Sequence, residues 1–248
     1  MSDPSAARPS VLIATPTRGA PKMQYMQSVI GTMKDLAQRG ISSDFDTMPG
    51  SDLVFQRSVL ASRFLERPEK FTHLFSVDDD MAFSNDLCSR LLAADKPLVA
   101  TVCSRRTLHL DRIEKALAEG LSLKQAMLAG HEWIVERAQK SGNETLCKVE
   151  NVGFGAVLIR RDVLEIMINK GTVGRYGAPD LQFYGFFARR PQDAAIAHIA
   201  EDRSFYRRWQ LDCGGEIWAL TDAQILHVGE FMYGGSYADV PSSHRTMV

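Results

Sequence analysis

The chain has 248 residues, of which 45% are hydrophobic and 24% are charged, which is enough for one large α/β domain with a sizeable core. Its formal net charge of −1 argues against bulk attraction to nucleic acid or anionic lipid, although a local basic patch stays possible. No apolar run approaches the roughly 20 residues of a transmembrane helix, and residues 1–10 lack the apolar core of a signal peptide. We therefore expect a disordered N-terminal tail at 1–10 and a soluble, cytoplasmic protein. The four cysteines are widely spaced, so we expect them to be reduced and mostly buried.

The first half of the chain alternates short apolar strands with amphipathic helices. The patterns predict strands at 11–14, 43–48, 71–77 and 98–103, and helices at 23–38, 53–66 and 85–94. This order implies an α/β fold with a mainly parallel sheet and helices on both of its faces. In such sheets ligands bind at the carboxyl ends of the strands.

The second half is less regular. Residues 108–139 fit two amphipathic helices broken near Gly120, which we interpret as a helical insertion spanning 108–147. Beyond it we expect a strand at 152–159, a helix at 161–169, a helix from 201 to 209, and strands at 217–220 and 225–228. Residues 11–107 and 148–248 would be two halves of one domain.

Three consecutive carboxylates, Asp78, Asp79 and Asp80, follow the third predicted strand. Adjacent Asp side chains repel one another, and proteins keep such clusters at a strand end when a divalent metal neutralises them. The alternative is a solvated acidic loop that caps the next helix. The first strand-to-helix turn, from Thr15 to Arg18, offers backbone amides that suit a nucleotide.

Arg57 falls on the apolar face of the second predicted helix, so its buried charge needs a partner. Either an ion pair with one of the Asp residues or a contact to a nucleotide phosphate or base would satisfy it. Farther along, Glu201 and Asp202 open a helix. Acids are common there because of the helix dipole, but a carboxylate that projects into a cleft could also act as a general base, and we favour Asp202 for that role.

His227 closes a short apolar strand, where a lone histidine is more often structural than a ligand. Together with Asp78 and Asp80 it would provide one imidazole and two carboxylates, a set that suits Mn²⁺ and could also take Mg²⁺. An aromatic loop around Phe183 and Tyr184 fits either stacking on an acceptor or core packing.

These pieces occur in an order that resembles the GT-A nucleotide-sugar glycosyltransferases, specifically the family-2-like group with many bacterial and phage members. The matching segments are 13–19, the Arg57 helix, 76–80, 152–155, 201–202 with Phe205 and Arg208, and 227–229. Two features depart from that pattern. Gln56-Arg57-Ser58 stands where many relatives have Ala-Arg-Asn, and the insertion is longer than we expect, which leaves the acceptor region open.

The resemblance implies a metal-dependent transfer of a sugar from a UDP- or GDP-sugar to a hydroxyl group, with Asp202 as the base of an inverting reaction. The acceptor could be a glycan, a protein, a lipid or a modified nucleobase, and a homo-oligomer is possible. The candidate residues are Asp202 and Glu201 for catalysis; Thr15, Pro16, Thr17, Arg18, Asp52, Arg57, Asp78, Asp79 and Arg105 for the donor; Asp78, Asp80 and His227 for the metal; and Phe154, Phe183, Tyr184 and Trp209 for the acceptor.

Three other functions compete with this hypothesis. A nucleotidyltransferase would also use carboxylates and a metal, but usually has a Gly-rich, basic first loop, whereas Thr15 to Gly19 has one Gly and one Arg. A non-catalytic carbohydrate-binding scaffold would bind metal without hydrolysing a donor. A two-metal nuclease lacks a second carboxylate group in a suitable context.

Overall fold

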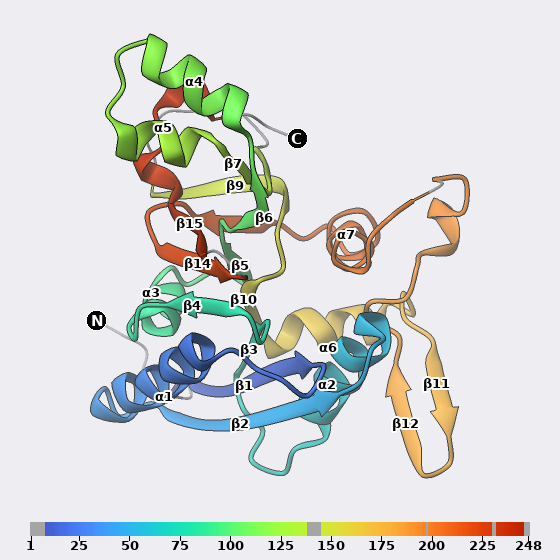
Figure 1. Ribbon diagram of the computed structural model, residues 1–248. Helices are drawn as coiled ribbons and strands as arrows, with labels where there is room; N and C mark the ends of the chain where they lie inside the picture. The colour runs from blue at the N-terminus through green and yellow to red at the C-terminus, as the bar shows by residue number, and fades with distance from the viewer. Residues whose placement is uncertain (1–7, 138–144, 197, 230–231, 246–248) are drawn as a thin grey trace, which may run out of the picture.

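A computed structural model describes residues 8–137, 145–196, 198–229 and 232–245 (Figure 1). The helices are α1 (Met23–Gln38), α2 (Leu53–Glu66), α3 (Leu87–Ala93), α4 (Leu110–Ala118), α5 (Leu123–Ala129), α6 (Arg161–Asn169) and α7 (Glu201–Arg207), and α7 continues into a π-helical turn at Arg208–Asp212. In this described part of the chain, no helix is both long and apolar enough to cross a bilayer.

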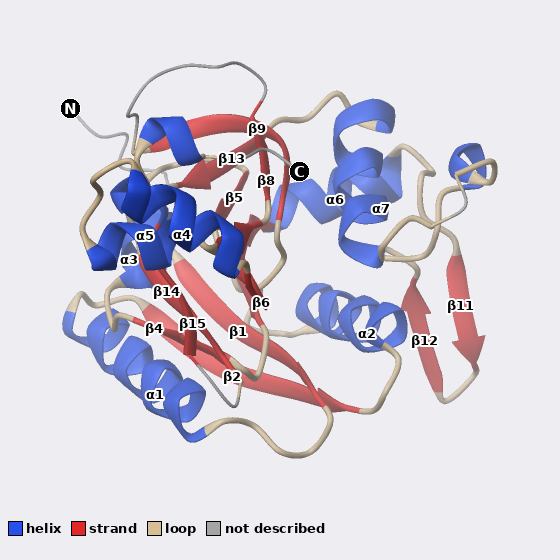
Figure 2. Cartoon of the chain, turned by 45° about the horizontal axis from the view of Figure 1, so that its top comes forward, coloured by secondary structure: helices blue, strands red, loops and turns tan. Residues whose placement is uncertain are grey.

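A large twisted sheet forms the centre of the molecule (Figure 2). Across it the strands are β2 (Ser42–Pro49), β1 (Ser10–Thr17), β3 (His73–Val77), β10 (Ala156–Arg160), β5 (Leu98–Thr101), β13 (Ile217–Leu220), β9 (Leu146–Val152) and β8 (Val135–Arg137). All of them run in one direction except β10 and β9, which are antiparallel to their neighbours. The predicted α/β class with a mainly parallel sheet is confirmed.

Helices cover both faces of this sheet, and the alternation of strand side chains explains why. In β1, Leu12 and Ala14 belong to the core layer that contains α2, α6 and α7, whereas Val11 and Ile13 face the layer of α1 and α3. Successive side chains of a strand point to opposite faces. Because both faces are apolar, each strand reads as a continuous hydrophobic run in the sequence.

Three smaller sheets surround the central one. One contains β15 (Met232–Ser236), β14 (Gln224–Val228) and β4 (Met81–Phe83), a second pairs β6 (Ser104–Leu108) with β7 (His131–Trp133), and a third is the hairpin of β11 (Arg175–Ala178) and β12 (Leu181–Tyr184). The β4–β14 pairing sets His227 opposite Met81. It therefore brings the end of the Asp cluster next to a residue almost 150 positions away.

Several predicted boundaries differ from the structure. The strand expected at 11–14 continues to Thr17, because β1 pairs with β2 over its whole length, so Thr15 and Pro16 lie in a strand and not in a turn. The strand expected at 152–159 is divided, since β9 ends at Val152 and β10 begins at Ala156. Residues 1–7 of the expected tail lie outside the described residues, and Ser10 already belongs to β1.

The insertion is only partly helical. Helices α4 and α5 flank Gly120, which has a φ of 84° and ends the first of them as expected. Residues 131–137, expected to be helical, form β7 and β8 instead, while 138 and 139 lie outside the described residues. The apolar side chains of these strands, Trp133 and Val135, are buried in the main core, so tertiary packing overrides the helical pattern.

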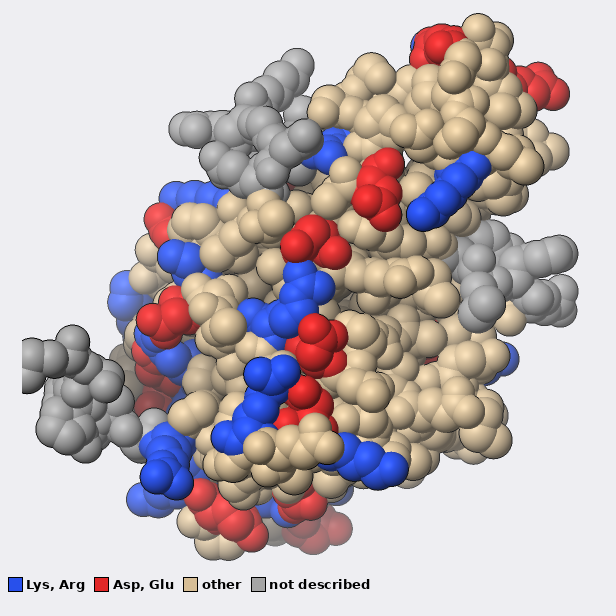
Figure 3. Space-filling model, turned by 90° about the vertical axis from the view of Figure 1, so that its left-hand side faces the viewer, with Lys and Arg blue, Asp and Glu red and all other residues tan. Residues whose placement is uncertain are grey.

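The remaining predictions concern cysteines and surface charge. Cys88, Cys103 and Cys147 are buried free thiols and Cys213 is half-buried, as expected. On the face that Figure 3 shows, basic and acidic side chains alternate, and neither sign forms an extended patch of its own.

Candidate functional site

The three residues of the Asp cluster, Asp78, Asp79 and Asp80, form a tight turn between β3 and β4. The backbone N–H of Asp78 donates to the carbonyl of Gly155 (3.1 Å), and that of Met81 donates back to the carbonyl of Asp78 (3.2 Å). The turn gives each side chain a different direction, because the chain reverses within three residues. Each of the three carboxylates consequently has its own partner.

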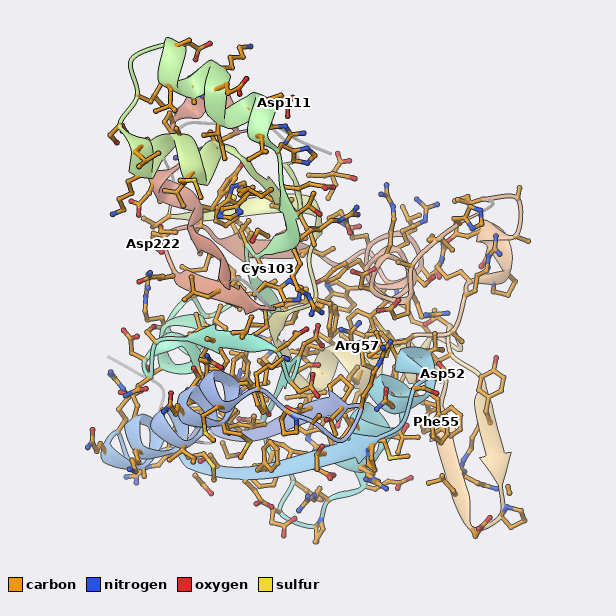
Figure 4. All side chains as sticks on the ribbon, viewed as in Figure 1. Asp52, Phe55, Arg57, Cys103, Asp111 and Asp222 are labelled. Carbon is orange, nitrogen blue, oxygen red and sulfur yellow. The ribbon has the colours of Figure 1, made fainter. Side chains whose placement is uncertain are left out.

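Arg57 is the partner of Asp78. Its side chain emerges from α2 toward the centre of the molecule, while Asp52 and Phe55 lie toward the β11–β12 hairpin (Figure 4). One guanidinium nitrogen donates to Asp78 (2.7 Å) and another to Glu201 (2.6 Å), with Arg57 only 4% exposed. The guanidinium also lies 4.8 Å from the centre of the Phe154 ring. Arg57 therefore joins the Asp cluster to the start of α7. Of the two partners that the sequence allowed for Arg57, an ion pair with an Asp residue or a contact to a nucleotide, the structure contains the ion pair.

Glu201 and Asp202 have different surroundings although they are adjacent. Glu201 is held by Arg57, whereas Asp202 accepts the backbone N–H of Arg203 (2.6 Å) and forms no ion pair with any described residue. Burial and the neighbouring charge of Glu201 raise the pKa of Asp202 above its ordinary value. An unpaired carboxylate of raised pKa is the better proton acceptor, which distinguishes Asp202 from Glu201 as a base.

The site carries an excess of negative charge. Burial, with a smaller contribution from the charge of Asp80, raises the pKa of Asp78, although the Arg57 guanidinium acts in the opposite direction. Asp78, Glu201 and Asp202 share the single cation of Arg57, and Asp78 adds to the forces that raise the pKa of Asp202. Such an excess suits a site that receives a cation or holds a proton acceptor.

Asp80 lies on the other side of the turn, against His227 and Arg106. Its Oδ2 is 3.2 Å from His227 Nε2 and 2.6 Å from a guanidinium nitrogen of Arg106. Burial by itself would raise the pKa of Asp80, but the hydrogen bond and charge of His227, together with the charge of Arg106, lower it overall. The backbone carbonyl of Asp80 also accepts the N–H of Val228 (2.7 Å), which secures the turn to β14.

The Asp80–His227 pair fits a divalent cation. His227 Nδ1 lies 3.0 Å from the carbonyl of Ser104, which can only accept, so Nδ1 carries the proton and donates it. Nε2 then lies 3.2 Å from Asp80 Oδ2, so the two atoms can share a proton or a metal cation between them. A backbone carbonyl that orients the ring in this way is the usual support of a metal-binding histidine.

The full ligand set expected for the metal is not assembled. Within the described residues, no three His, Cys, Asp or Glu side chains are arranged to hold one ion. Asp80 and His227 meet, whereas Asp78 is turned toward Arg57. The role of Asp78 as a third ligand therefore stays a prediction.

The expected donor residues lie around the ends of β1 and β2. Thr17 donates its hydroxyl to Asp79 (2.5 Å), Thr15 shares a hydrogen bond with the hydroxyl of Tyr25 (2.5 Å), and Arg18 is exposed in the following turn. Asp52 caps α2 by accepting the N–H of Phe55 (3.2 Å). Pro16 is buried within β1, so its side chain packs and does not face a ligand.

Two adjacent arginines, Arg105 and Arg106, follow the strand predicted at 98–103, and the sequence analysis proposed Arg105 as the donor-binding residue. In the structure Arg105 pairs with Glu132 (3.1 Å), and Arg106 reaches Asp80. The segment is strand β6 and not a loop, and neighbouring side chains of a strand point to opposite sides. Sequence reasoning therefore missed Arg106. Because the pairing register of β6 is irregular between Ser104 and Leu108, only the tertiary structure decides which of the two arginines faces the cluster.

The four expected acceptor residues divide into two groups. Phe154 and Trp209 are 3% and 5% exposed and belong to the main core, with Trp209 donating its indole N–H to the carbonyl of Glu216 (2.9 Å). Phe183 and Tyr184 are half-buried on β12, where Phe183 packs edge-on against Phe55 with ring centres 5.2 Å apart. Only this second group presents surface that an acceptor could contact.

Comparisons with known proteins bear on the fold. No protein-family model matches the chain, and no curated protein sequence matches it either. Among solved structures, A197 from STIV has a TM-score of 0.50 with 15% identity, over 89% of this chain and 86% of that one. At this identity the likeness shows a shared fold.

Two further structures are more distant. The Drosophila β-1,4-galactosyltransferase 7 mutant, in complex with manganese, UDP-Gal and xylobiose, has a TM-score of 0.43 and 14% identity over 96% of this chain and 74% of that one. A glycosyltransferase involved in glycosylation of the major capsid of PBCV-1 has a TM-score of 0.33 and 13% identity, over 65% of each chain. Both TM-scores lie below 0.5, so the fold rests on the strand order of the mainly parallel α/β sheet and not on these two likenesses.

Proposed function

We propose that this chain is a metal-dependent glycosyltransferase that moves a sugar from a nucleoside-diphosphate sugar to an acceptor hydroxyl. The observation that carries the proposal is that two groups of residues meet at the turn that follows β3. Asp80 and His227 form a cation-accepting pair, and Arg57 ties the same turn to the helix that presents Asp202. Arg57 thereby joins the proposed site for the donor phosphates to the helix that carries the proposed proton acceptor.

Each residue has a role that follows from its contacts. Asp80 and His227, with Asp78 as the expected third ligand, would hold Mn²⁺ or Mg²⁺, which as a Lewis acid stabilises the negative charge of the departing diphosphate. Arg57 fixes Glu201 and thereby the first turn of α7. Asp202 accepts the proton of the acceptor hydroxyl as that oxygen attacks the anomeric carbon. Because its pKa is raised, Asp202 holds that proton better than an ordinary surface carboxylate would.

The proposal can be tested by measuring melting temperatures with a panel of UDP- and GDP-sugars, each with and without Mn²⁺. A ligand that binds the folded state stabilises it by RT ln(1 + [L]/Kd), about 2.7 kcal/mol at a concentration of 100 times Kd. We expect one donor to raise the melting temperature only when Mn²⁺ is present. The Asp80→Asn variant should lose this donor-dependent shift when the shift is measured from the variant's own melting temperature without ligand.

Other outcomes would identify the competing functions. A shift with CTP or another nucleoside triphosphate in preference to every nucleotide sugar would indicate nucleotidyl transfer. Binding of Mn²⁺ and donor without any hydrolysis or transfer would indicate a carbohydrate-binding scaffold. A donor-induced shift that survives both Asp80→Asn and removal of Mn²⁺ would contradict the metal-dependent proposal.

A further inference from the structure

Arg106 occupies a distinctive position in the site. It donates to the same Asp80 oxygen that faces His227 Nε2, at 2.6 Å, yet its own side chain is 47% exposed. Asp80 is only 16% exposed. A long, half-exposed cation thus sits on a shielded carboxylate, at the point where the proposed metal would bind.

We propose that Arg106 competes with the divalent metal for Asp80 and, once displaced, contacts the diphosphate of the donor. The inference rests on the proposed function and adds a residue that the sequence reasoning did not select. Without a metal, the guanidinium balances the charge of Asp80. With a metal bound, the same guanidinium is free to pair with the added phosphate charge.

Electrostatics favours this competition at Oδ2, the Asp80 oxygen that both Arg106 and His227 contact. A guanidinium and a divalent cation on one carboxylate oxygen would repel each other, and this repulsion is weakly screened because Asp80 is shielded from solvent. His227, the other neighbour of Asp80 Oδ2, is held in place by the contact of its Nδ1 with the carbonyl of Ser104. Among Asp80, His227 and Arg106, Arg106 has the most exposed side chain and is therefore the group that a metal would displace.

A displaced Arg106 guanidinium could pair with phosphate in place of Asp80. An arginine offers five N–H donors in a fixed fork, which matches phosphate oxygens as well as a carboxylate. Strand β6 lies against β14, where His227 contacts the carbonyl of Ser104, so the proposal keeps the displaced guanidinium next to the site. Arg105, one residue away, pairs with Glu132 and serves as the internal comparison.

The inference requires two effects of opposite sign. In Arg106→Ala, Mn²⁺ alone should bind about tenfold more tightly, because a competing cation is gone. With Mn²⁺ saturating, UDP or GDP should bind about tenfold more weakly, because a phosphate partner is gone. Arg106→Lys should lie between the wild type and Arg106→Ala in both measurements, since an ammonium keeps the charge but lacks the fork.

Free Mn²⁺ measured by electron paramagnetic resonance reports the first affinity, and calorimetry with UDP and with GDP reports the second. Arg105→Ala is the matched control, and its Mn²⁺ affinity should equal that of the wild type. An equal gain in Arg105→Ala would mean that only net charge matters and would overturn the inference. Unchanged Mn²⁺ affinity in Arg106→Ala would overturn it as well, provided that Asp80→Asn has lost Mn²⁺ binding.

Failure of the proposed function would give a different set of Mn²⁺ affinities from failure of the Arg106 inference alone. If Asp80→Asn and His227→Ala both keep the Mn²⁺ affinity of the wild type, the metal site itself is misplaced, and the role of Arg106 falls with it. If Asp80→Asn abolishes Mn²⁺ binding and the two affinities of Arg106→Ala move in opposite directions, the inference stands, whichever sugar and acceptor the enzyme uses.

Discussion

Two buried clusters of arginine and carboxylate flank α7, and they differ in charge balance. At its start, Arg57 bridges Asp78 and Glu201, with Asp202 beside them and no second arginine paired to these acids among the described residues. The cluster therefore has more acids than bases. Burial is the largest cause that raises the pKa values of Asp78 and Asp202, and the Arg57 guanidinium acts in the opposite direction on both.

The second cluster joins the segment before α7 to the end of that helix and the turn after it, and it is balanced. Arg190 donates to both oxygens of Asp193 (3.0 and 2.9 Å) and to both oxygens of Asp212 (2.9 and 2.6 Å). Arg207 donates to Asp193 as well (3.0 and 2.8 Å). The hydrogen bond from Arg207 lowers the pKa of Asp193, with Arg190 acting in the same direction. Two arginines and two aspartates satisfy one another completely.

The difference in charge balance supports a structural role for the second cluster and agrees with the functional role that we propose for the first. A balanced cluster of bidentate pairs needs nothing further, so it anchors the loop before α7 to the turn after it. An acid-rich cluster is unfavourable unless a ligand, a metal or a proton completes it. The same residue types, at the two ends of one short helix, thus serve different purposes because their numbers differ.

The largest effect that we expect is on transfer in Asp202→Asn. The amide keeps the size of the side chain but cannot accept the proton of the acceptor hydroxyl, so the transfer rate should fall by about 10² to 10⁴-fold. Donor binding should be unchanged. Steady-state kinetics with the donor identified in the thermal screen measures the rate, and calorimetry measures binding. A variant with full transfer would remove Asp202 from the chemistry and point to another base.

The next effect concerns stability. In Asp193→Asn the Arg190 and Arg207 guanidinium groups lose a charged partner that is 2% exposed, and the free energy of unfolding should fall by about 3 kcal/mol. Urea denaturation measures this loss. Because Asp202→Asn relieves repulsion and does not break an ion pair, its stability at pH 7 should equal or exceed that of the wild type. Equal destabilisation by Asp193→Asn and Asp202→Asn would contradict the difference in charge balance that we describe between the two clusters.

The two clusters should also respond to pH in opposite ways. The folded-state pKa of Asp193 is lowered, so its stabilisation is complete above its ordinary pKa of 3.8 and is lost as the pH falls through the lower folded value. The folded-state pKa of Asp202 is raised, so this group favours folding more as the pH falls through that raised value. Melting curves of the wild type and of each Asn variant between pH 3 and pH 8 would separate the two contributions.

Transfer should follow the raised pKa of Asp202. The base acts only when deprotonated, so we expect the rate to drop about tenfold for each pH unit below that pKa, and to level off above it. A pH–rate profile with a midpoint at or below the ordinary carboxyl pKa of 3.8 would be incompatible with this assignment.

The smallest effect is expected at an exposed ion pair next to both clusters. Arg203 pairs with Glu136 (3.0 Å) and is 46% exposed, so Arg203→Ala should change the free energy of unfolding by less than about 1 kcal/mol. It follows Asp202 directly in the chain and is therefore a matched control for that variant. A loss as large as that of Asp193→Asn would show that position on α7, and not charge balance, controls stability.

Much of the fold could be predicted from local pattern. The helices at 23–38 and 53–66 were expected with the bounds that α1 and α2 have, because their apolar faces repeat with helical period and Gly40 and Asp52 supply clear end signals. The α/β class followed from the alternation of strands and helices. The Asp cluster, Arg57, Asp202 and His227 could be singled out because charged or titratable residues interrupt apolar segments.

What the sequence determined by itself was therefore the inventory of elements and of chemically capable side chains, since both depend on short-range periodicity. Tertiary structure alone decided the partners. Pairing of β4 with β14 sets His227 beside Asp80, strand β6 turns Arg106 and not Arg105 to that carboxylate, and packing buries Phe154 and Trp209 in the core. These outcomes depend on contacts between residues that are distant in the chain, and local propensity carries no information about which distant segments will meet.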